Sequence, residues 1–257
     1  MAFPEIDSLL RLTELTRANL PALTEQIDEF AQRTSETEPR HYAGYRQIPL
    51  PRFRPRWWPS LDRVLRTRRW QQELSTRPLQ LAELGRLLQL SHGVCAPGGR
   101  GPTPSAGGLN GLELYVVSGW TREPATNTES LSTRHAPCPQ GVFHYNREGH
   151  SLAQLSLVAD EALWRELVPS SRMLSGGRVL WIVVGDVTRV KAKYGVRAER
   201  FLLLEAGHLM QNLCLVSTSL GLVTIPLGGF LEGEIARELQ LLGTDRVLYC
   251  GVCGSQP

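Results

Sequence analysis

The stretch from about Arg200 to Leu220 constrains the fold of this chain more than any other segment. It has helical character, ends before Gly221, and is apolar on nearly every face. A helix on the surface needs a polar face toward water, so this one must be buried at the centre of the fold or against a second subunit. The chain has 257 residues and 42% hydrophobic content, which is enough for a sizeable core.

Three polar residues interrupt this apolar helix at helical spacing. Glu205, His208 and Asn212 occupy positions i, i+3 and i+7, which place them on one face. Buried polar groups need hydrogen-bond partners, so this pattern predicts a satisfied internal network. Catalysis by the same three residues is the alternative interpretation.

The distribution of positive charge singles out a second segment. Lys191 and Lys193 are the only lysines, whereas the rest of the 28 basic residues are arginines. Arginine keeps its proton under essentially all conditions, but a desolvated lysine can lose it and act as a base. Tyr194 adds a second group that can move a proton. The segment therefore suggests acid–base chemistry, with two solvated surface lysines near the end of a strand as the alternative.

Two glycine-rich segments adjoin predicted strands. Residues 98–108 are too rich in glycine and proline for regular structure, and they run into a strand at 112–117. Residues 223–230 place two glycines directly after a strand-like run. Such bare backbone lets a flat ligand or a phosphate approach closely, although neither segment matches a Walker or Rossmann pattern. A further strand is predicted at 179–184 and an amphipathic helix at about 79–93.

Residues 1–60 are predicted to form a polar, mostly helical extension, followed by a main domain over 61–257. The end of the extension, 47–59, combines prolines and arginines with Phe53, Trp57 and Trp58. We expect this strip to lie as an arm over another domain or subunit. Base stacking on nucleic acid is the alternative, but the net charge of +3 gives it little support.

Several other classes of protein are not expected. No apolar run approaches the roughly 18 residues of a membrane span, and the first residues lack the basic-then-apolar order of a signal peptide. The five cysteines are irregularly spaced and give no disulfide framework. Cys250 and Cys253 form a Cys-X-X-Cys motif within a strand pattern, where redox and zinc sites are unusual. We expect a cytoplasmic protein without a bound metal.

Five blocks of sequence occur in an order that is specific: PSAGGLNGLELY at 104–115, GVFHY at 141–145, KYGVRAERF at 193–201, EAGHLMQNL at 205–213 and GLVTIPLGGF at 221–230. Together they resemble the SagB-type dehydrogenases, the azoline-oxidising branch of the flavin-dependent nitroreductase superfamily. The resemblance covers residues from about 61 to 254. One block departs from it, because residues 68–74 read RRWQQEL where the family usually has Arg-Arg-Ser-X-Arg-X-Phe.

The resemblance implies an α+β, nitroreductase-like fold with a mostly antiparallel sheet wrapped by helices. It also implies a homodimer that binds two FMN molecules at its interface. Arg68 and Arg69, with Gln72 in place of the second arginine, would lie at the phosphate or ribityl chain, and Arg197 and Arg200 could supply the charge that Gln72 lacks. Pro104, Ser105, Ala106, Gly107 and Gly108 would line the flavin, from the same or the partner subunit, while Leu227, Gly228 and Gly229 would run along the isoalloxazine.

The activity implied by the resemblance is oxidation of a thiazoline or oxazoline in a modified peptide to a thiazole or oxazole during natural-product biosynthesis. Hydride acceptance belongs to FMN, and the protein must remove a proton. Lys193 and Tyr194 fall on the family's Lys-Tyr pair, where the base is expected. The azoline peptide could come from a cyclodehydratase partner or from a carrier-bound assembly line, and the sequence leaves both open. A nitro- or quinone-type NAD(P)H reductase and a non-catalytic scaffold subunit remain alternatives.

Overall fold

The structure is a computed structural model that describes residues 11–32, 40–52, 59–75, 77–119, 136–176 and 179–256. These residues contain one seven-stranded sheet in the order β1-β4-β3-β2-β5-β7-β6, and each neighbouring pair is antiparallel. The predicted α+β class with a mostly antiparallel sheet is therefore confirmed. The strands are β1 (Gln47–Pro49), β2 (Leu112–Ser118), β3 (Gly141–Asn146), β4 (Ser151–Ser156), β5 (Val179–Asp186), β6 (Leu222–Leu227) and β7 (Asp245–Ser255).

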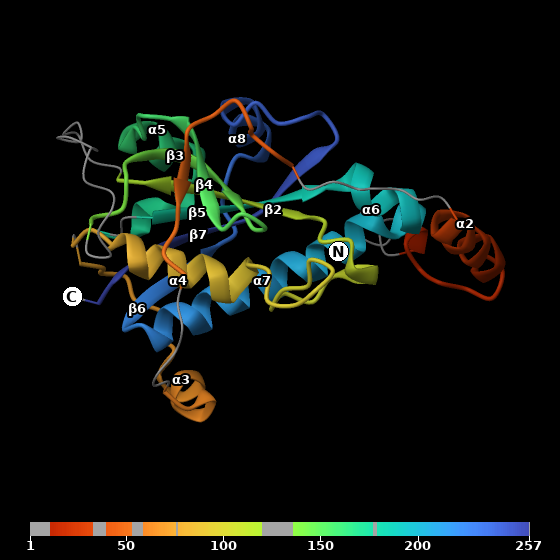
Figure 1. The fold of residues 1–257 in the computed structure, drawn as a ribbon, viewed down its shortest axis with the longest axis horizontal. Helices are drawn as coiled ribbons and strands as arrows, with labels where there is room; N and C mark the ends of the chain where they lie inside the picture. Colours follow the sequence, from red (N-terminus) through yellow and green to blue (C-terminus); the bar gives the residue numbers. More distant parts are fainter. Residues whose placement is uncertain are drawn as a thin grey trace, which may run out of the picture.

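Helices cover both faces of this sheet (Figure 1). On one face lie α4 (Leu81–His92) and α7 (Ala198–Ser219), and on the other lie α5 (Glu161–Leu167) and α8 (Glu232–Glu238). The remaining helical segments are α2 (Leu20–Gln32), α3 (Leu61–Thr67), α6 (Val187–Tyr194) and the short 3₁₀ turns η1 (Ala106–Gly108), η3 (Pro169–Met173) and η4 (Gly195–Arg197).

The predicted strand at 179–184 is the buried centre of this arrangement. Along β5, Val179, Trp181 and Val183 contact the core beneath α4 and α7, while the alternate residues contact the core beneath α5 and α8. A strand covered on both faces reads as a continuous apolar run, which explains the sequence pattern. The predicted strand at 112–117 is likewise confirmed as β2, which pairs with β5.

The predicted amphipathic helix at 79–93 is confirmed as α4. It begins with a capping box in which the backbone N–H of Gln80 donates to the Glu83 carboxylate over 2.8 Å. Leu84, Leu87 and the other inward residues of α4 are fully buried, and the helix ends before Gly93. The local signals of start, face and end therefore agreed with the tertiary environment.

The long apolar helix is only partly covered within one chain. The face of α7 that carries Leu202, Leu209 and Leu213 is fully buried against α4 and the sheet. Leu203 and Leu204, however, are 51% and 55% exposed. The expectation of burial is thus met on one side, and the other side presents an apolar surface that a second subunit would have to cover.

The predicted extension contributes to the sheet as well as packing beside it. β1 is an edge strand that pairs with β4, a position that tolerates proline because one side of the strand needs no partner. Helix α2 packs against α6, where the Gln26 amide donates to the Lys191 carbonyl over 3.2 Å. The aromatic residues Phe53, Trp57 and Trp58 lie outside the described residues. No described helix is long and apolar enough to cross a membrane.

The Cys-X-X-Cys motif lies within β7, as its pattern predicted. Cys250 contacts the core beneath α5 and α8, whereas Cys253 contacts the core beneath α4 and α7. Residues three apart in a strand point to opposite faces, so the two sulfurs cannot bind the same ion. Burial raises the pKa of both thiols, that of Cys253 to about 12.

Candidate active site

The antiparallel pairing of β2 with β5 brings together the segments that carry the predicted chemistry. Leu112 lies opposite Gly185, and the Asp186 backbone N–H donates to the Gly111 carbonyl over 2.8 Å. The chain that precedes β2 therefore lies beside the chain that follows β5. The first is the glycine-rich loop, and the second is α6, which ends at Tyr194.

The Lys193–Tyr194 pair lies at the end of α6, the short helix that follows β5. α6 begins directly after β5, where the Asp186 carboxylate caps it by accepting the Arg189 backbone N–H over 3.0 Å. It ends at Gly195, whose φ is 53°. With only two turns, α6 gave the sequence too short a periodic pattern to identify.

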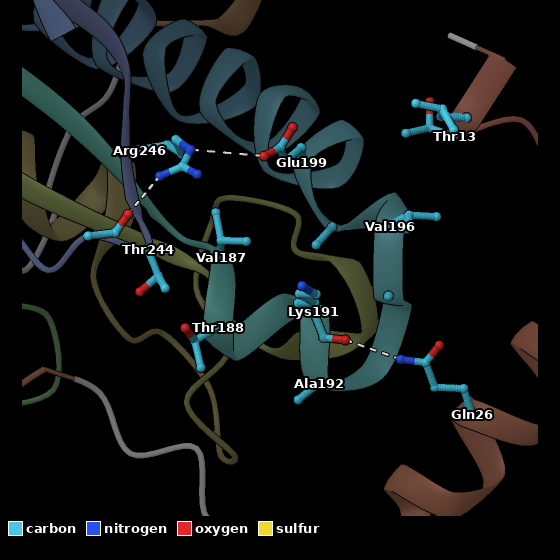
Figure 2. A pocket seen from close by; sticks show the side chains of 14 residues that line it. Thr13, Gln26, Val187, Thr188, Lys191, Ala192, Val196, Glu199, Thr244 and Arg246 are labelled. Carbon is cyan, nitrogen blue, oxygen red and sulfur yellow. Dashed lines mark hydrogen bonds and ion pairs between the residues drawn. The ribbon is translucent and has the colours of Figure 1, made fainter. Parts of the chain in front are cut away.

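The two lysines of α6 face different environments. Lys191 is exposed and lines a pocket of about 770 Å³ between α2, α6, the start of α7 and the start of β7 (Figure 2). Lys193 is half-buried, and its ammonium nitrogen lies 5.6 Å from the centre of the Phe30 ring and 5.4 Å from that of Tyr194. The pocket therefore lies beside Lys191, whereas the predicted catalytic lysine packs elsewhere.

Both members of the predicted pair contact the glycine-rich loop at one residue. A Cβ atom on Gly107 would lie 2.5 Å from the Tyr194 hydroxyl and 2.7 Å from the Lys193 nitrogen. Gly107 also has a φ of 58°, which side chains disfavour. A side chain at this position would therefore displace the ends of Tyr194 and Lys193 and strain the backbone. The loop over Pro104–Gly108 and the acid–base pair form a single cluster.

Glu205 anchors this loop from α7. Its carboxylate accepts the Ser105 hydroxyl over 3.0 Å and the Ala106 backbone N–H over 2.7 Å. The Ser105 hydroxyl in turn accepts the Asn110 backbone N–H over 2.8 Å. The predicted internal network therefore includes Glu205, and its partner is the glycine-rich loop itself.

The other two residues of the polar pattern behave differently from Glu205. The Asn212 amide donates weakly to the Ser91 carbonyl and to the Thr103 hydroxyl, over 3.4 and 3.3 Å. His208 is exposed on the uncovered face of α7. The prediction of a satisfied network is thus correct for two of the three residues.

Electrostatics link Glu205 to the tyrosine. Burial raises the pKa of Glu205, although its hydrogen bonds to the loop oppose this effect. Burial and the nearby Glu205 charge together raise the pKa of Tyr194. The Tyr194 ring also packs on Phe201, with 4.8 Å between ring centres. The phenol is therefore held in a defined position and favoured in its protonated form.

Arg68, another of the predicted flavin residues, lies beside the C-terminal half of α7. Burial raises the pKa of Cys214 to about 11 and the Arg68 charge lowers it, which places Arg68 near that part of the helix. The Gln72 carbonyl accepts the Ser175 backbone N–H over 3.1 Å. Arg69 is exposed, with its guanidinium donating to the Arg66 and Arg68 carbonyls.

The loop after β6 is held near η3. Leu227 is buried, and the Gly229 carbonyl accepts the backbone N–H and the hydroxyl of Ser170, over 3.2 and 2.7 Å. No atom of the described chain lies within 4 Å of a Cβ built on Gly228. This loop therefore presents open backbone, as its sequence predicted.

Within one chain Arg68 lies away from the first group, which is the cluster of Glu205, the Pro104–Gly108 loop and the Lys193–Tyr194 pair. Glu205 marks this group on α7 and Cys214 marks the position of Arg68, and nine helical residues correspond to about 14 Å along the axis. Arg197 and Arg200 lie with the first group, where both guanidinium groups donate to Thr13. Their predicted role at a phosphate stays a prediction.

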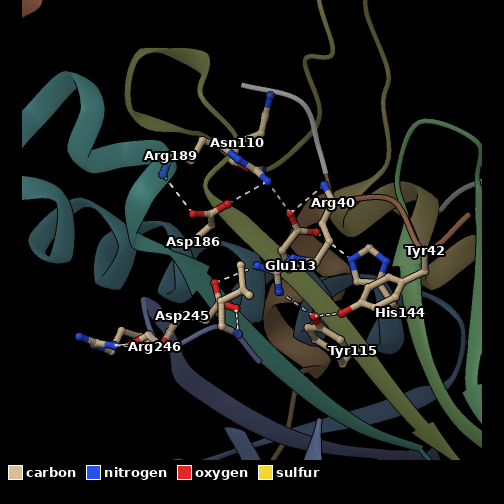
Figure 3. Close-up of polar contacts among 12 residues, drawn as sticks. Arg40, Tyr42, Asn110, Glu113, Tyr115, His144, Asp186, Arg189, Asp245 and Arg246 are labelled. Atoms are coloured by element: carbon tan, nitrogen blue, oxygen red, sulfur yellow. Dashed lines mark hydrogen bonds and ion pairs between the residues drawn. The ribbon is translucent and has the colours of Figure 1, made fainter. Parts of the chain in front are cut away.

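A buried charge network, which the sequence did not reveal, supports the first group (Figure 3). The Glu113 carboxylate binds the Arg189 guanidinium at 2.7 Å and the His144 imidazole at 2.8 Å. Arg189 also donates to the Asn110 carbonyl over 2.7 Å, which links α6 to the end of the glycine-rich loop. Burial alone would raise the pKa of Glu113, but hydrogen bonds and charges from His144 and Arg189 lower it to about 2.

The sequence matches the Nitroreductase family over residues 65–255. The chain belongs to the nitroreductase family. It is 31% identical to a nitroreductase homologue from Methanocaldococcus jannaschii over 185 residues, which are 71% of this chain and 85% of that protein. The departures at 68–74 therefore occur within a family member.

Solved structures share the nitroreductase fold. A nitroreductase-type protein from Ralstonia eutropha matches with a TM-score of 0.68 and 20% identity, over 86% of this chain and 94% of that chain. A chain in the E. coli microcin synthetase McbBCD complex with truncated pro-MccB17 bound matches with a TM-score of 0.61 and 19% identity, over 97% of both chains. At these identities the likeness concerns the fold.

Proposed function

We propose that this nitroreductase-family protein is an FMN-dependent azoline dehydrogenase, which oxidises thiazoline or oxazoline rings of a modified peptide. One observation carries the proposal: Lys193 and Tyr194 both close on Gly107, at the centre of the loop expected to line a flavin. A base beside a flavin-lining loop is the arrangement that removal of a ring proton requires.

The residues present fit FMN. Gly108 and Gly228 offer backbone with no atom of the described chain within 4 Å of a Cβ position, so a flat ring can approach either loop. Arg68 and Arg69 supply guanidinium groups for a phosphate. Bound there, FMN would accept the hydride that leaves the azoline ring.

A homodimer would complete such a site. In one chain the Pro104–Gly108 loop and Arg68 lie beside positions of α7 that are about 14 Å apart. Leu203 and Leu204 present an uncovered apolar surface on the same helix. A second copy packed on α7 would cover these leucines and could bring its own loop toward the first chain's Arg68 and Gly228.

The protein's own contribution to the reaction is the removal of a proton. The azoline becomes aromatic when the former Cα loses a proton and the ring loses a hydride, so that a new double bond forms. In this proposal the side-chain nitrogen of Lys193 takes that proton. Tyr194 donates a hydrogen bond that orients the ring or the amine. Phe30 packs beside the Lys193 nitrogen, and Phe201 packs on the Tyr194 ring.

The fold shared with a chain of the microcin synthetase complex supports a peptide substrate and a partner complex, such as a cyclodehydratase or a carrier protein. Family membership alone equally supports a nitro- or quinone-type reductase that takes electrons from NAD(P)H. The experiment must therefore distinguish reduction of the flavin by an azoline peptide from reduction of the flavin by NAD(P)H.

The test is anaerobic addition of an azoline peptide to the purified protein. We expect FMN released on denaturation, bleaching of the flavin absorbance by the peptide, and a peptide product that has lost two hydrogen atoms. Bleaching by NADPH but not by the peptide would establish the reductase alternative. Protein that binds no FMN would contradict the proposal and favour a scaffold subunit.

Variants of Lys193 and Tyr194 test the proposed base, and a variant of Lys191 on the same helix is the control. Lys193→Ala, Lys193→Arg and Tyr194→Phe should each keep FMN but lose turnover by about 10²–10⁴-fold. Lys191→Arg, on the pocket side of the same helix, should retain turnover. Arginine keeps the charge but cannot release its proton. Near-native turnover of Lys193→Arg would make Lys193 a charge contact and not a base.

A further inference from the structure

Glu205 is a buried carboxylate held by neutral donors. It is 3% exposed, and among the described residues no arginine, lysine or histidine forms an ion pair with it. A buried carboxylate without an ion-pair partner is unfavourable for folding, and the charge of His208, three residues along α7, offsets this only in part. An apolar residue would suit this helix better if packing were the only requirement, so the carboxylate calls for another role.

A continuous set of contacts leads from this carboxylate to the predicted catalytic pair. Glu205 accepts the Ser105 hydroxyl and the Ala106 N–H. The next residue, Gly107, is the point at which the Lys193 nitrogen and the Tyr194 hydroxyl approach the backbone. Any shift of Ser105–Ala106 must therefore move the surface against which both side chains pack.

We propose that Glu205 is a positioning residue for the Lys193–Tyr194 pair, because its hydrogen bonds to Ser105 and Ala106 hold Gly107 in the place where the pair closes on it. This inference rests on the proposed function and goes beyond it. It adds a residue from a third element, α7, to a site otherwise formed by α6 and the glycine-rich loop.

The negative charge of Glu205 also favours different roles for Lys193 and Tyr194. Among the described residues, Glu205 from α7 and Lys193 from α6 lie near the Tyr194 phenol, and the Arg197 guanidinium lies over the Phe201 ring that packs on it. A negative group beside a phenol opposes its ionisation. Tyr194 therefore remains a hydrogen-bond donor, and Lys193 is the group that accepts the proton.

Two substitutions separate the hydrogen bonds from the charge. Glu205→Leu removes both hydrogen bonds, which end on the same carboxylate oxygen, and a misplacement of about 1 Å lowers turnover by about 10²-fold. Glu205→Gln keeps a carbonyl oxygen that can accept from Ser105 and Ala106, so it should restore kcat to within about 10-fold of the parent. The KM for the peptide should change little in either variant, since neither removes a substrate contact.

Asn212→Leu serves as the control, because it removes a different hydrogen bond between α7 and the same stretch of chain. It should leave kcat near the parent value. A folded, FMN-loaded Glu205→Leu protein with parental kcat would overturn the proposal. So would a Glu205→Gln protein no better than Glu205→Leu, because position would then not be the cause.

A spectroscopic measurement tests Glu205 without turnover. The difference in tyrosinate absorbance between each protein and its Tyr194→Phe derivative isolates the titration of this one phenol. It should move to lower pH in Glu205→Gln and stay in place in Asn212→Leu. An unchanged titration in Glu205→Gln would contradict the claim that the Glu205 charge opposes ionisation of the Tyr194 phenol. Failure of the parent to oxidise azolines would contradict the proposed function but leave this measurement intact.

Discussion

Replacement of Gly107 by alanine tests the geometry at the centre of the site. The added Cβ would lie 2.5 Å from the Tyr194 hydroxyl and 2.7 Å from the Lys193 nitrogen, whereas ordinary contacts begin at 3.4 Å. The ends of both side chains must therefore retreat by about 1 Å, and a displacement of this size lowers turnover by roughly 10²-fold. That loss corresponds to about 2.7 kcal/mol in the activation barrier.

The effect of the same substitution on stability should be much smaller. Alanine at the Gly107 φ of 58° is strained by about 1–2 kcal/mol. Part of this is offset by the lower entropy of the unfolded chain, about 0.4–1 kcal/mol. The tips of a lysine and a tyrosine can move without disturbing the core. We therefore expect the free energy of unfolding to fall by only about 1 kcal/mol.

Gly98→Ala is the matched control for this prediction. Gly98 has a φ of 75° in the same glycine-rich loop, and no atom of the described residues lies within 4 Å of its Cβ position. Urea unfolding should give similar stability losses for the two variants, while kcat for azoline oxidation falls only in Gly107→Ala. FMN content is measured in parallel. Equal kcat values in the two folded, FMN-loaded variants would refute the proposed contact between Gly107 and the catalytic pair.

Two further predictions concern assembly and acid stability. Leu203→Glu with Leu204→Glu should convert a dimer to monomer in sedimentation at micromolar concentration and release FMN; a parent that sediments as a monomer with FMN bound would contradict the dimer. Because the folded pKa of Glu113 is lowered to about 2, its stabilising effect is present above the unfolded value and is lost as the pH falls through about 4 toward 2. This loss amounts to about 3 kcal/mol, and the pH slope of urea unfolding should flatten in Glu113→Gln. An unchanged slope in that variant would mean that other groups govern acid unfolding.

The sequence alone determined the regular elements that have a strong periodic signal. The strands at 112–117 and 179–184 are apolar runs buried on both faces, and the helix at 79–93 has an apolar face with recognisable ends. These signals are local, because period and capping depend on neighbours along the chain. The helix at 200–220 was found for the same reason, and its excess of apolar residues indicated a surface that one chain leaves open.

The candidate residues were also identified from the sequence, but not their arrangement. Lys193 stood out through the scarcity of lysine, and the glycine-rich loop through its composition. Glu205 was expected to satisfy a buried network, yet its partner Ser105 lies 100 residues away in the chain. The Glu113–Arg189 pair was not anticipated, since a single charged residue in a strand does not indicate which distant cation will neutralise it.

Tertiary structure decided these contacts through strand register. Leu112 opposite Gly185 places the end of the glycine-rich loop beside the start of α6. A shift of one residue in that pairing would turn every side chain of β2 to the other face of the sheet and separate Gly107 from Lys193. Register depends on the packing of both faces of the sheet at once, so no local pattern in the sequence specifies it.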